Sequence, residues 1–341
     1  MREFVVCLGL KISHSKFKLD SIMLKNNTKI KVGLAQIAPV WLNKKKTTKK
    51  IIRYMEKAAK KGCDLVTFGE TILPGYPFWL DFTDASRFNS DRQKDLYANY
   101  LQQAVSIENG DLDSICAVAK ANEIAVILGI AERAADRGNH SVYCTLVYIN
   151  ADGSIGHTHR KLMPTYEERL CWAQGDGNGL QVQKLGDFTV GGLNCWENWM
   201  PLPRAALYGL GEDLHVAIWP GNTRNTEILT RFLAREGRSY TISVSGLFRR
   251  KDIPKNTPHY DLIKANCAKM PADGGSCIAN PDGSWLVEPI TGKEALVVAE
   301  LDHNEVLRER QNFDCVGHYS RPDVTKLVVN RERQSTVKYE I

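Results

Sequence analysis

Cys195 stands out in this sequence as a side chain that could do chemistry, because of the pattern around it. It follows the apolar run 188–194 and precedes a stretch with helical spacing at 201–210. A strand, a sharp turn and a helix in that order present one side chain beside the unpaired N–H groups of a helix start. The positive helix end and a nearby cation can deprotonate a thiol placed there. The pattern therefore indicates a cysteine nucleophile.

Glu70 and Lys161 also come just after predicted strands. Glu70 ends the run 65–70 and precedes a rigid, proline-containing segment, and Lys161 follows the run 155–160. Reactive groups in α/β proteins gather at the carboxyl ends of strands, so both side chains could meet Cys195 in one crevice. Each of the three residues also has an ordinary structural interpretation when it is considered alone. Glu70 could be a solvated loop acid, Lys161 a surface lysine and Cys195 a buried thiol of the core. Spacing alone does not assemble them.

The elements that would position these residues alternate between strands and helices. Alternating or β-branched runs predict strands at 30–37, 64–68, 124–130, 142–150, 155–160, 188–194, 215–219, 240–248, 276–279, 285–288 and 295–301. Apolar residues at helical spacing predict helices at 47–61, 111–122, 201–210 and 226–238. Turn sequences at 151–154 and 280–284 join neighbouring strands as hairpins. We expect an α/β protein in which helices cover mixed sheets within one domain.

Composition narrows the class of protein. The chain of 341 residues has a net charge of +6, and residues 1–30, with six basic and two acidic side chains, carry four of those charges. The remainder is nearly neutral, which argues against nucleic acid as a partner. No apolar run approaches the roughly 18 residues that a membrane span needs, so no membrane partner is expected.

The cysteines and the two ends of the chain give further expectations. Nine cysteines without a C-x-x-C pair indicate free thiols in a reducing compartment, which predicts a cytoplasmic protein. We interpret residues 1–28 as a basic, disordered extension, and Met23 is a candidate for the native start. Residues 29–303 form the expected single domain, followed by a tail over 304–341.

Three segments of the chain resemble the signature blocks of the nitrilase, or carbon–nitrogen hydrolase, superfamily. They are FGETILPGYP at 68–77, HRKLMPTYEER at 159–169 and GLNCWENWMP at 192–201. Two later segments, GSCIANPDG at 275–283 and DCVGHYSRPD at 314–323, look similar too. Three blocks in the family's order are far more specific than one short motif, and the resemblance extends from about Lys31 to Asp323.

The resemblance implies a catalytic Glu–Lys–Cys triad of Glu70, Lys161 and Cys195. It also implies that Glu168, seven residues after the lysine, holds the lysine and the substrate, with the adjacent Glu167 as the alternative. The implied fold is a four-layer α-β-β-α sandwich of two mixed sheets. The family also forms homo-oligomers, either dimers or spirals of dimers, which would place the tail at an interface.

The block around Cys195 resembles the true nitrilase branch of the superfamily. The expected substrate is therefore a small-molecule nitrile, which Cys195 would attack while the backbone N–H of Trp196 stabilises the developing negative charge. No metal and no organic cofactor is implied. One departure from the family pattern is Gly69, where a proline often stands, and we expect glycine to loosen the backbone that carries Glu70.

Aromatic residues near these motifs are candidates for the substrate pocket, with core packing as the alternative for each. They are Tyr76, Trp79, Trp196, Trp199 and Trp219.

Other functions remain open on the sequence. An amidase or carbamoylase would use the same triad, as would a cyanide hydratase or dihydratase. A metalloenzyme would use His157 and His159 as metal ligands, but the chain has neither an H-E-x-x-H nor a C-x-x-C motif. The glycine-rich segment 175–179 lacks the lysine and hydroxyl of a phosphate-binding loop.

Overall fold

The computed structural model describes residues 28–337. The expected N-terminal extension and the alternative start at Met23 therefore lie outside the described residues, apart from Thr28. Among the described residues, no helix is both long enough and apolar enough to cross a bilayer.

The first sheet contains six strands in the order β12-β1-β2-β3-β4-β5. Their bounds are β1 Lys29–Gln36, β2 Leu65–Phe68, β3 Ala125–Arg133, β4 Val142–Ile149, β5 Ile155–Arg160 and β12 Ala295–Asp302. Strands β1, β2 and β3 are parallel, whereas β12 and β4 run antiparallel to their neighbours. Because β5 is in turn antiparallel to β4, it points the same way as β2 and ends at the same edge of the sheet.

The second sheet repeats this plan in the order β11-β10-β9-β8-β7-β6. Its strands are β6 Gln183–Leu185, β7 Phe188–Asn194, β8 Leu214–Trp219, β9 Tyr240–Ser245, β10 Gly274–Ala279 and β11 Trp285–Thr291. The central strands β7, β8 and β9 are parallel, their neighbours β6 and β10 run antiparallel to them, and the edge strand β11 is antiparallel to β10.

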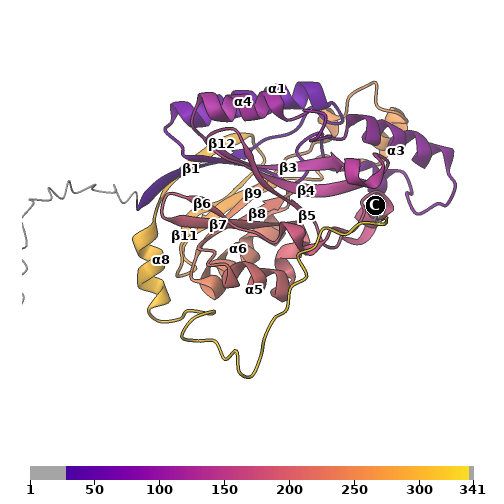
Figure 1. Ribbon diagram of the computed structural model, residues 1–341. Coiled ribbons are helices and arrows are strands. Elements are labelled where there is room, and N and C mark those ends of the chain that lie inside the picture. Colours follow the sequence, from indigo (N-terminus) through magenta and orange to yellow (C-terminus); the bar gives the residue numbers. More distant parts are fainter. Residues whose placement is uncertain (1–27, 338–341) are drawn as a thin grey trace, which may run out of the picture.

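Helices cover the outer faces of both sheets, which gives four layers (Figure 1). Helices α1 (Lys44–Lys60) and α4 (Asp113–Ala121) pack on the first sheet, and α5 (Pro201–Gly209) and α6 (Thr223–Gly237) pack on the second. Between the sheets, side chains from both inner faces form one buried apolar core. The four-layer α-β-β-α sandwich expected from the resemblance is confirmed.

Helix α1 shows how the sequence pattern sets a local element. The Asn43 side chain accepts a hydrogen bond from the Lys46 N–H at the start of the helix. Ile51 and Met55, one turn apart, are buried against the sheet. The helix ends at Lys60, and Gly62 follows the C-cap residue Lys61 with a φ of +72° that suits glycine.

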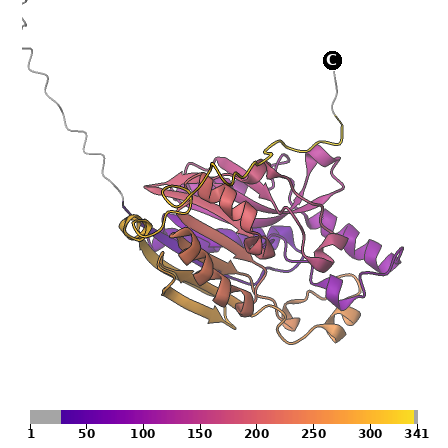
Figure 2. The same ribbon diagram turned by 90° about the horizontal axis from the view of Figure 1, so that it is seen from below.

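Four helices were not predicted: α2 (Trp79–Phe82), α3 (Asp91–Gln103), α7 (Tyr260–Asn266) and α8 (His303–Arg310). In the 13 residues of α3 only Leu96 and Tyr100 are buried, so its apolar pattern is too sparse to recognise. Helix α8 lies at the start of the expected tail, and Val306 in it packs into the central core. After α8 the chain runs as an extended segment past α5 (Figure 2).

Candidate active site

The three sequence-predicted residues lie at the ends of strands. Glu70 comes two residues after β2, Lys161 directly after β5 and Cys195 directly after β7. The first two strands belong to one sheet and β7 to the other. The packing of the two sheets therefore brings the three positions together, as the crevice argument predicted.

Lys161 lies between two carboxylates. Its Nζ is 2.9 Å from Oε1 of Glu70 and 2.7 Å from Oε2 of Glu168. All three side chains are buried. The Lys161 ammonium also lies 5.5 Å from the ring centre of Trp172. The structure thus joins the lysine to Glu168, whereas no ion pair links it to Glu167 among the described residues.

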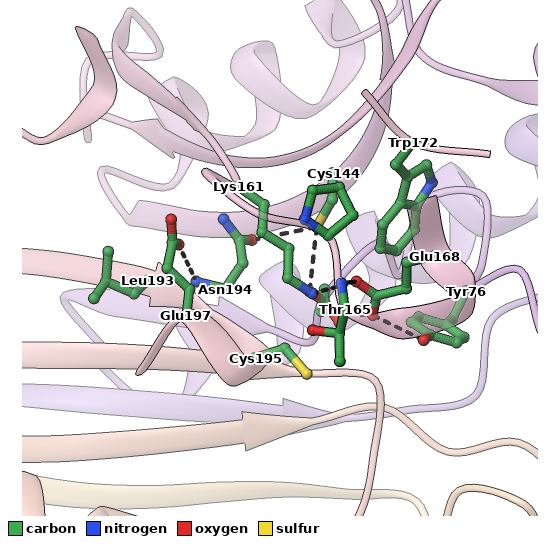
Figure 3. A network of polar contacts seen from close by, with 12 residues as sticks. Tyr76, Cys144, Lys161, Thr165, Glu168, Trp172, Leu193, Asn194, Cys195 and Glu197 are labelled. Carbon is green, nitrogen blue, oxygen red and sulfur yellow. Dashed lines mark hydrogen bonds and ion pairs between the residues drawn. The ribbon is translucent and has the colours of Figure 1, made fainter. Parts of the chain in front are cut away.

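Glu168 is held by the local fold of the chain around it. It belongs to a short 3₁₀ helix, η2 (Tyr166–Leu170), and its Oε2 accepts a hydrogen bond of 2.6 Å from the N–H of Thr165. The hydroxyl of Tyr76 donates to its other oxygen at 2.8 Å. Figure 3 shows Thr165, Tyr76 and Lys161 around the Glu168 carboxylate. Glu168 therefore accepts hydrogen bonds from three donors, which fix the orientation of its carboxylate.

Cys195 occupies a strained turn. Its φ of +49° lies in the left-handed region, which is uncommon for a residue with a side chain. The residue begins the 3₁₀ helix η4 (Cys195–Trp199), and about 5% of its surface is exposed. Its sulfur and one carboxylate oxygen each of Glu70 and Glu168 all lie within 4.8 Å of one another. The site therefore places the sulfur close to both acids.

A buried glutamate ties the two segments of this site together. Glu197 accepts hydrogen bonds from the N–H of Leu162 at 2.8 Å and from that of Asn194 at 3.1 Å. The ring nitrogen Nε2 of His159 lies 2.9 Å from the same carboxylate. Leu162 follows Lys161 and Asn194 precedes Cys195 in the chain. Glu197 therefore fixes the lysine segment against the cysteine segment.

Burial governs the proton positions in the site. Burial raises the pKa of Glu70 to about 7 against the opposing charge of Lys161, and Glu168 adds to the increase. Burial also raises the pKa of the Cys195 thiol well above its usual range. The nearby Glu70 charge raises this pKa further, and its effect is larger than the opposite effect of Lys161. Burial lowers the pKa of Lys161, but the facing acids, led by Glu70, hold it well above normal. The lysine is thus charged.

In the folded protein, burial and the Glu70 charge outweigh the helix end and the cation that we expected to deprotonate Cys195. The turn after the cysteine is a five-residue 3₁₀ helix, and α5 begins only at Pro201. The aligned peptide dipoles beside the sulfur are consequently few. The N–H of Trp196 does face the sulfur and lowers its pKa, but burial dominates. The resting thiol keeps its proton.

The expected looseness at Gly69 is also wrong. A Cβ atom at this position would lie 2.7 Å from the backbone nitrogen of Gly246 and 2.8 Å from the carbonyl oxygen of Trp219. Close packing between the two sheets thus requires glycine here. The N–H of Glu70 donates to the same Trp219 carbonyl at 3.0 Å. The segment that carries Glu70 is enclosed.

The candidate pocket residues lie in different environments. Tyr76 touches the site through Glu168, and Trp219 is buried in a small apolar cluster with Cys195. Trp79 is buried against Tyr100, and it also lines a cavity of about 350 Å³ that reaches the end of η2. The side chains of Trp196 and Trp199 are both about half exposed.

Sequence reasoning missed Cys144 and Thr165. Thr165 could have been recognised from the spacing of a capping box, because it precedes Glu168 by three residues. Cys144 gave no such signal, since it lies within the uniformly apolar run of β4. Only the pairing of β4 with its neighbours brings its sulfur to within 3.2 Å of Glu70.

The donor atoms of Glu70, Glu168 and Cys195 are close enough together to suit a cation. The Lys161 ammonium already contacts both carboxylates and supplies a positive charge at that point. His159, a candidate ligand in the metalloenzyme interpretation, is engaged with Glu197.

Comparison with known proteins identifies the family and agrees with the fold. The family profile described as carbon–nitrogen hydrolase matches residues 31–311. The chain therefore belongs to the carbon–nitrogen hydrolase family, whose members are hydrolases that act on carbon–nitrogen bonds.

Similar proteins include several nitrilases. "Nitrilase 2" from an unknown prokaryotic organism is 36% identical over 312 residues, covering 91% of this chain and 95% of the relative. An aliphatic nitrilase from Sinorhizobium fredii is 34% identical over 310 residues, covering 91% and 98%. Among solved structures, a carbon–nitrogen hydrolase from Helicobacter pylori has a TM-score of 0.66 at 20% identity, covering 86% of this chain and 96% of that one. This last likeness concerns the fold.

Proposed function

We propose that the protein is a nitrilase that hydrolyses an organic nitrile to the carboxylic acid and ammonia. The observation that carries the proposal is the buried contact of Lys161 with Glu70 and Glu168 beside the Cys195 sulfur. The similarity to proteins named nitrilases over about nine-tenths of the chain supports the same reaction.

In the proposed reaction the Cys195 sulfur attacks the nitrile carbon while Glu70 takes the thiol proton. The pKa of Glu70, at about 7, suits a group that accepts and returns a proton near neutral pH. Glu70 then returns this proton to the nitrile nitrogen, so the product of this step is a thioimidate and Glu70 is again ionised. The Lys161 ammonium and the N–H of Trp196 stabilise the negative charge that develops on that nitrogen.

Two water molecules complete the reaction. The first, deprotonated by Glu70, adds to the thioimidate carbon, and the tetrahedral intermediate expels ammonia to leave a thioester. The second adds to the thioester, breaks the carbon–sulfur bond, and releases the carboxylic acid and the free thiol. Overall one nitrile and two waters give one acid and one ammonia. The sulfur carries the covalent step, so this route uses no organic cofactor or metal.

The proposal can be tested by measuring ammonia release from a panel of nitriles. The panel contains aliphatic, aromatic and arylaceto nitriles, and each is tested beside its amide. We expect turnover of at least one nitrile, unchanged by a chelator. Cys195→Ala should abolish it while leaving the circular dichroism spectrum intact. Cys63→Ala, which removes a buried thiol remote from the site, is the control. Turnover of amides alone would instead indicate an amidase or carbamoylase, and amide as the main product would indicate a hydratase.

We propose further that the protein is a homo-oligomer, a dimer or a spiral of dimers, and that it acts in the cytoplasm. Exposed apolar side chains on α5 and α6, namely Leu202, Ile228 and Phe232, support a contact between copies. All eight cysteines within residues 28–337 are free thiols, which suits a reducing compartment. Immunogold labelling of source cells that finds the protein outside the cytoplasm would contradict this location.

A further inference from the structure

The two oxygens of the Glu70 carboxylate have different surroundings. Oε1 accepts from Lys161 Nζ at 2.9 Å and lies 3.2 Å from the Cys144 sulfur. Oε2 is buried and has no hydrogen-bond partner within residues 28–337. One oxygen is therefore saturated with donors, and the other is available to accept a proton.

Cys144 belongs to β4, one of the two strands that lie between β2 and β5 in the first sheet. Its carbonyl accepts a hydrogen bond of 2.8 Å from the N–H of Lys161. Its side chain is buried and points to Glu70, while its other acceptor, Oδ1 of Asn194, is more distant at 3.6 Å. One residue thus contacts both the lysine backbone and the glutamate side chain.

The Cys144 sulfur is a hydrogen-bond donor in this position. Burial raises the pKa of the thiol well above its usual range, and the Glu70 charge adds to the increase. The residue lies in the middle of a regular strand ladder, without the strained turn that presents Cys195. Cys144 is therefore suited to holding a partner in place and not to attack on a substrate.

We propose that Cys144 is a positioning residue whose thiol donates to Oε1 of Glu70 and so leaves Oε2 as the oxygen that takes the proton from Cys195. This proposal rests on the proposed function, because it assigns Glu70 the role of base. It adds a second thiol to the site, with a role different from that of the nucleophile.

The pH dependence of Glu70 depends on all the groups around it. Those that face it are Lys161 after β5, Glu168 in η2, Cys144 on β4 and Cys195 after β7, with Tyr76 and Tyr100 farther out. Of these, Cys144 is the neutral donor that contacts the carboxylate directly. Removing it disfavours the ionised form of Glu70 without changing any charge.

The test compares Cys144→Ala and Cys144→Ser with the wild-type protein and with Cys63→Ala. Two profiles are measured against pH: kcat/KM for ammonia release, and the rate of Cys195 alkylation by iodoacetamide, read by peptide mass spectrometry. In Cys144→Ala we expect the acidic limb of both profiles, where the rate falls as the pH drops, to shift to a pH about half a unit higher. We also expect kcat to fall by about 3- to 10-fold. Cys144→Ser, which keeps a donor, should retain the wild-type limb.

Several outcomes would overturn the inference. Equal shifts in the alanine and serine variants would mean that the thiol acts through packing, and unchanged limbs in both would mean that it does not position Glu70. Alkylation needs no substrate, so this readout stands even if the wild-type protein turns over no nitrile, a result that would refute the proposed function separately. If Cys144→Ala does not fold, a shifted limb in Cys144→Ser contradicts the inference by itself.

Discussion

Glu70 and Glu168 share a single cation, Lys161, in a buried site. Glu168 has further donors in Thr165 and Tyr76, whereas Oε2 of Glu70 has none among the described residues. Burial raises the pKa of Glu70 to about 7, so this acid can exchange a proton near neutral pH. This difference separates the roles that we propose for the two acids: Glu70 exchanges protons and Glu168 holds the lysine.

The first prediction at this scale concerns the pH dependence of the reaction. Glu70 must be ionised to take the thiol proton, so kcat/KM should fall as the pH drops through about 7, by roughly tenfold for each unit below it. The measurement is initial rates of ammonia release between pH 5 and 9, at nitrile concentrations well below KM. Glu167→Gln, which changes the neighbour of Glu168 but not Glu70, should keep the same limb. A rate that is flat down to about pH 5 would contradict the assignment of Glu70 as base.

At the scale of elements, the site depends on how the segment after β5 is joined to the segment after β7. Glu197 makes this connection through the N–H groups of Leu162 and Asn194. The Asn198 side chain stabilises the strained backbone of Cys195, because it donates a hydrogen bond of 2.8 Å to the Cys195 carbonyl. Asn198 itself faces His215 at 2.7 Å, so buried side chains hold both sides of the turn.

Glu197→Gln tests this connection. An amide offers one acceptor oxygen where the carboxylate offers two, so its NH₂ group must face one of the donors. We expect a loss of about 1–3 kcal/mol in the free energy of unfolding. We also expect kcat to fall more than KM rises, because Lys161 and Cys195 lose their fixed spacing. Urea unfolding and steady-state kinetics measure both effects.

The control for this prediction is Glu56→Gln on the exposed face of α1, which should change neither quantity. Wild-type kcat in Glu197→Gln, together with a lowered stability, would show that Glu197 supports the fold without setting the spacing in the site.

At the scale of the whole molecule, α5 and α6 form an outer layer that carries apolar side chains. Ile228 is about 66% exposed and Leu202 about 62%. Burying such residues between two copies would remove their apolar surface from water, which favours association. The extended segment after α8 runs past α5 and continues to the 175–181 loop, where Arg333 pairs with Asp176 at 3.0 Å.

Ile228→Glu tests the proposed contact between copies. A charge in the centre of this face should shift the protein from oligomer to monomer, as measured by light scattering during size-exclusion chromatography. Ile155→Glu at the start of β5, which is exposed and belongs to the first sheet, should leave the oligomer unchanged. A wild-type protein that is monomeric at micromolar concentration would refute the proposal.

The sequence by itself determined the positions of the strands other than β6, the helices with dense apolar patterns and, through the family resemblance, the residues that meet at the strand ends. These features are local: β2, β7 and α1 follow from alternation, β-branching and spacing within short windows. Helices α3 and α8 were missed because few of their residues are buried, and burial depends on the rest of the fold.

Only the tertiary structure decided the chemical state of the site. It paired Lys161 with Glu168, enclosed Gly69, kept the proton on Cys195 and brought Cys144 to Glu70. The physical reason is that pKa values and hydrogen bonds depend on burial and on neighbours from other strands. Residues 70, 144 and 161 come together when β2, β4 and β5 assemble into one sheet, and Cys195 joins them only when the second sheet packs against the first.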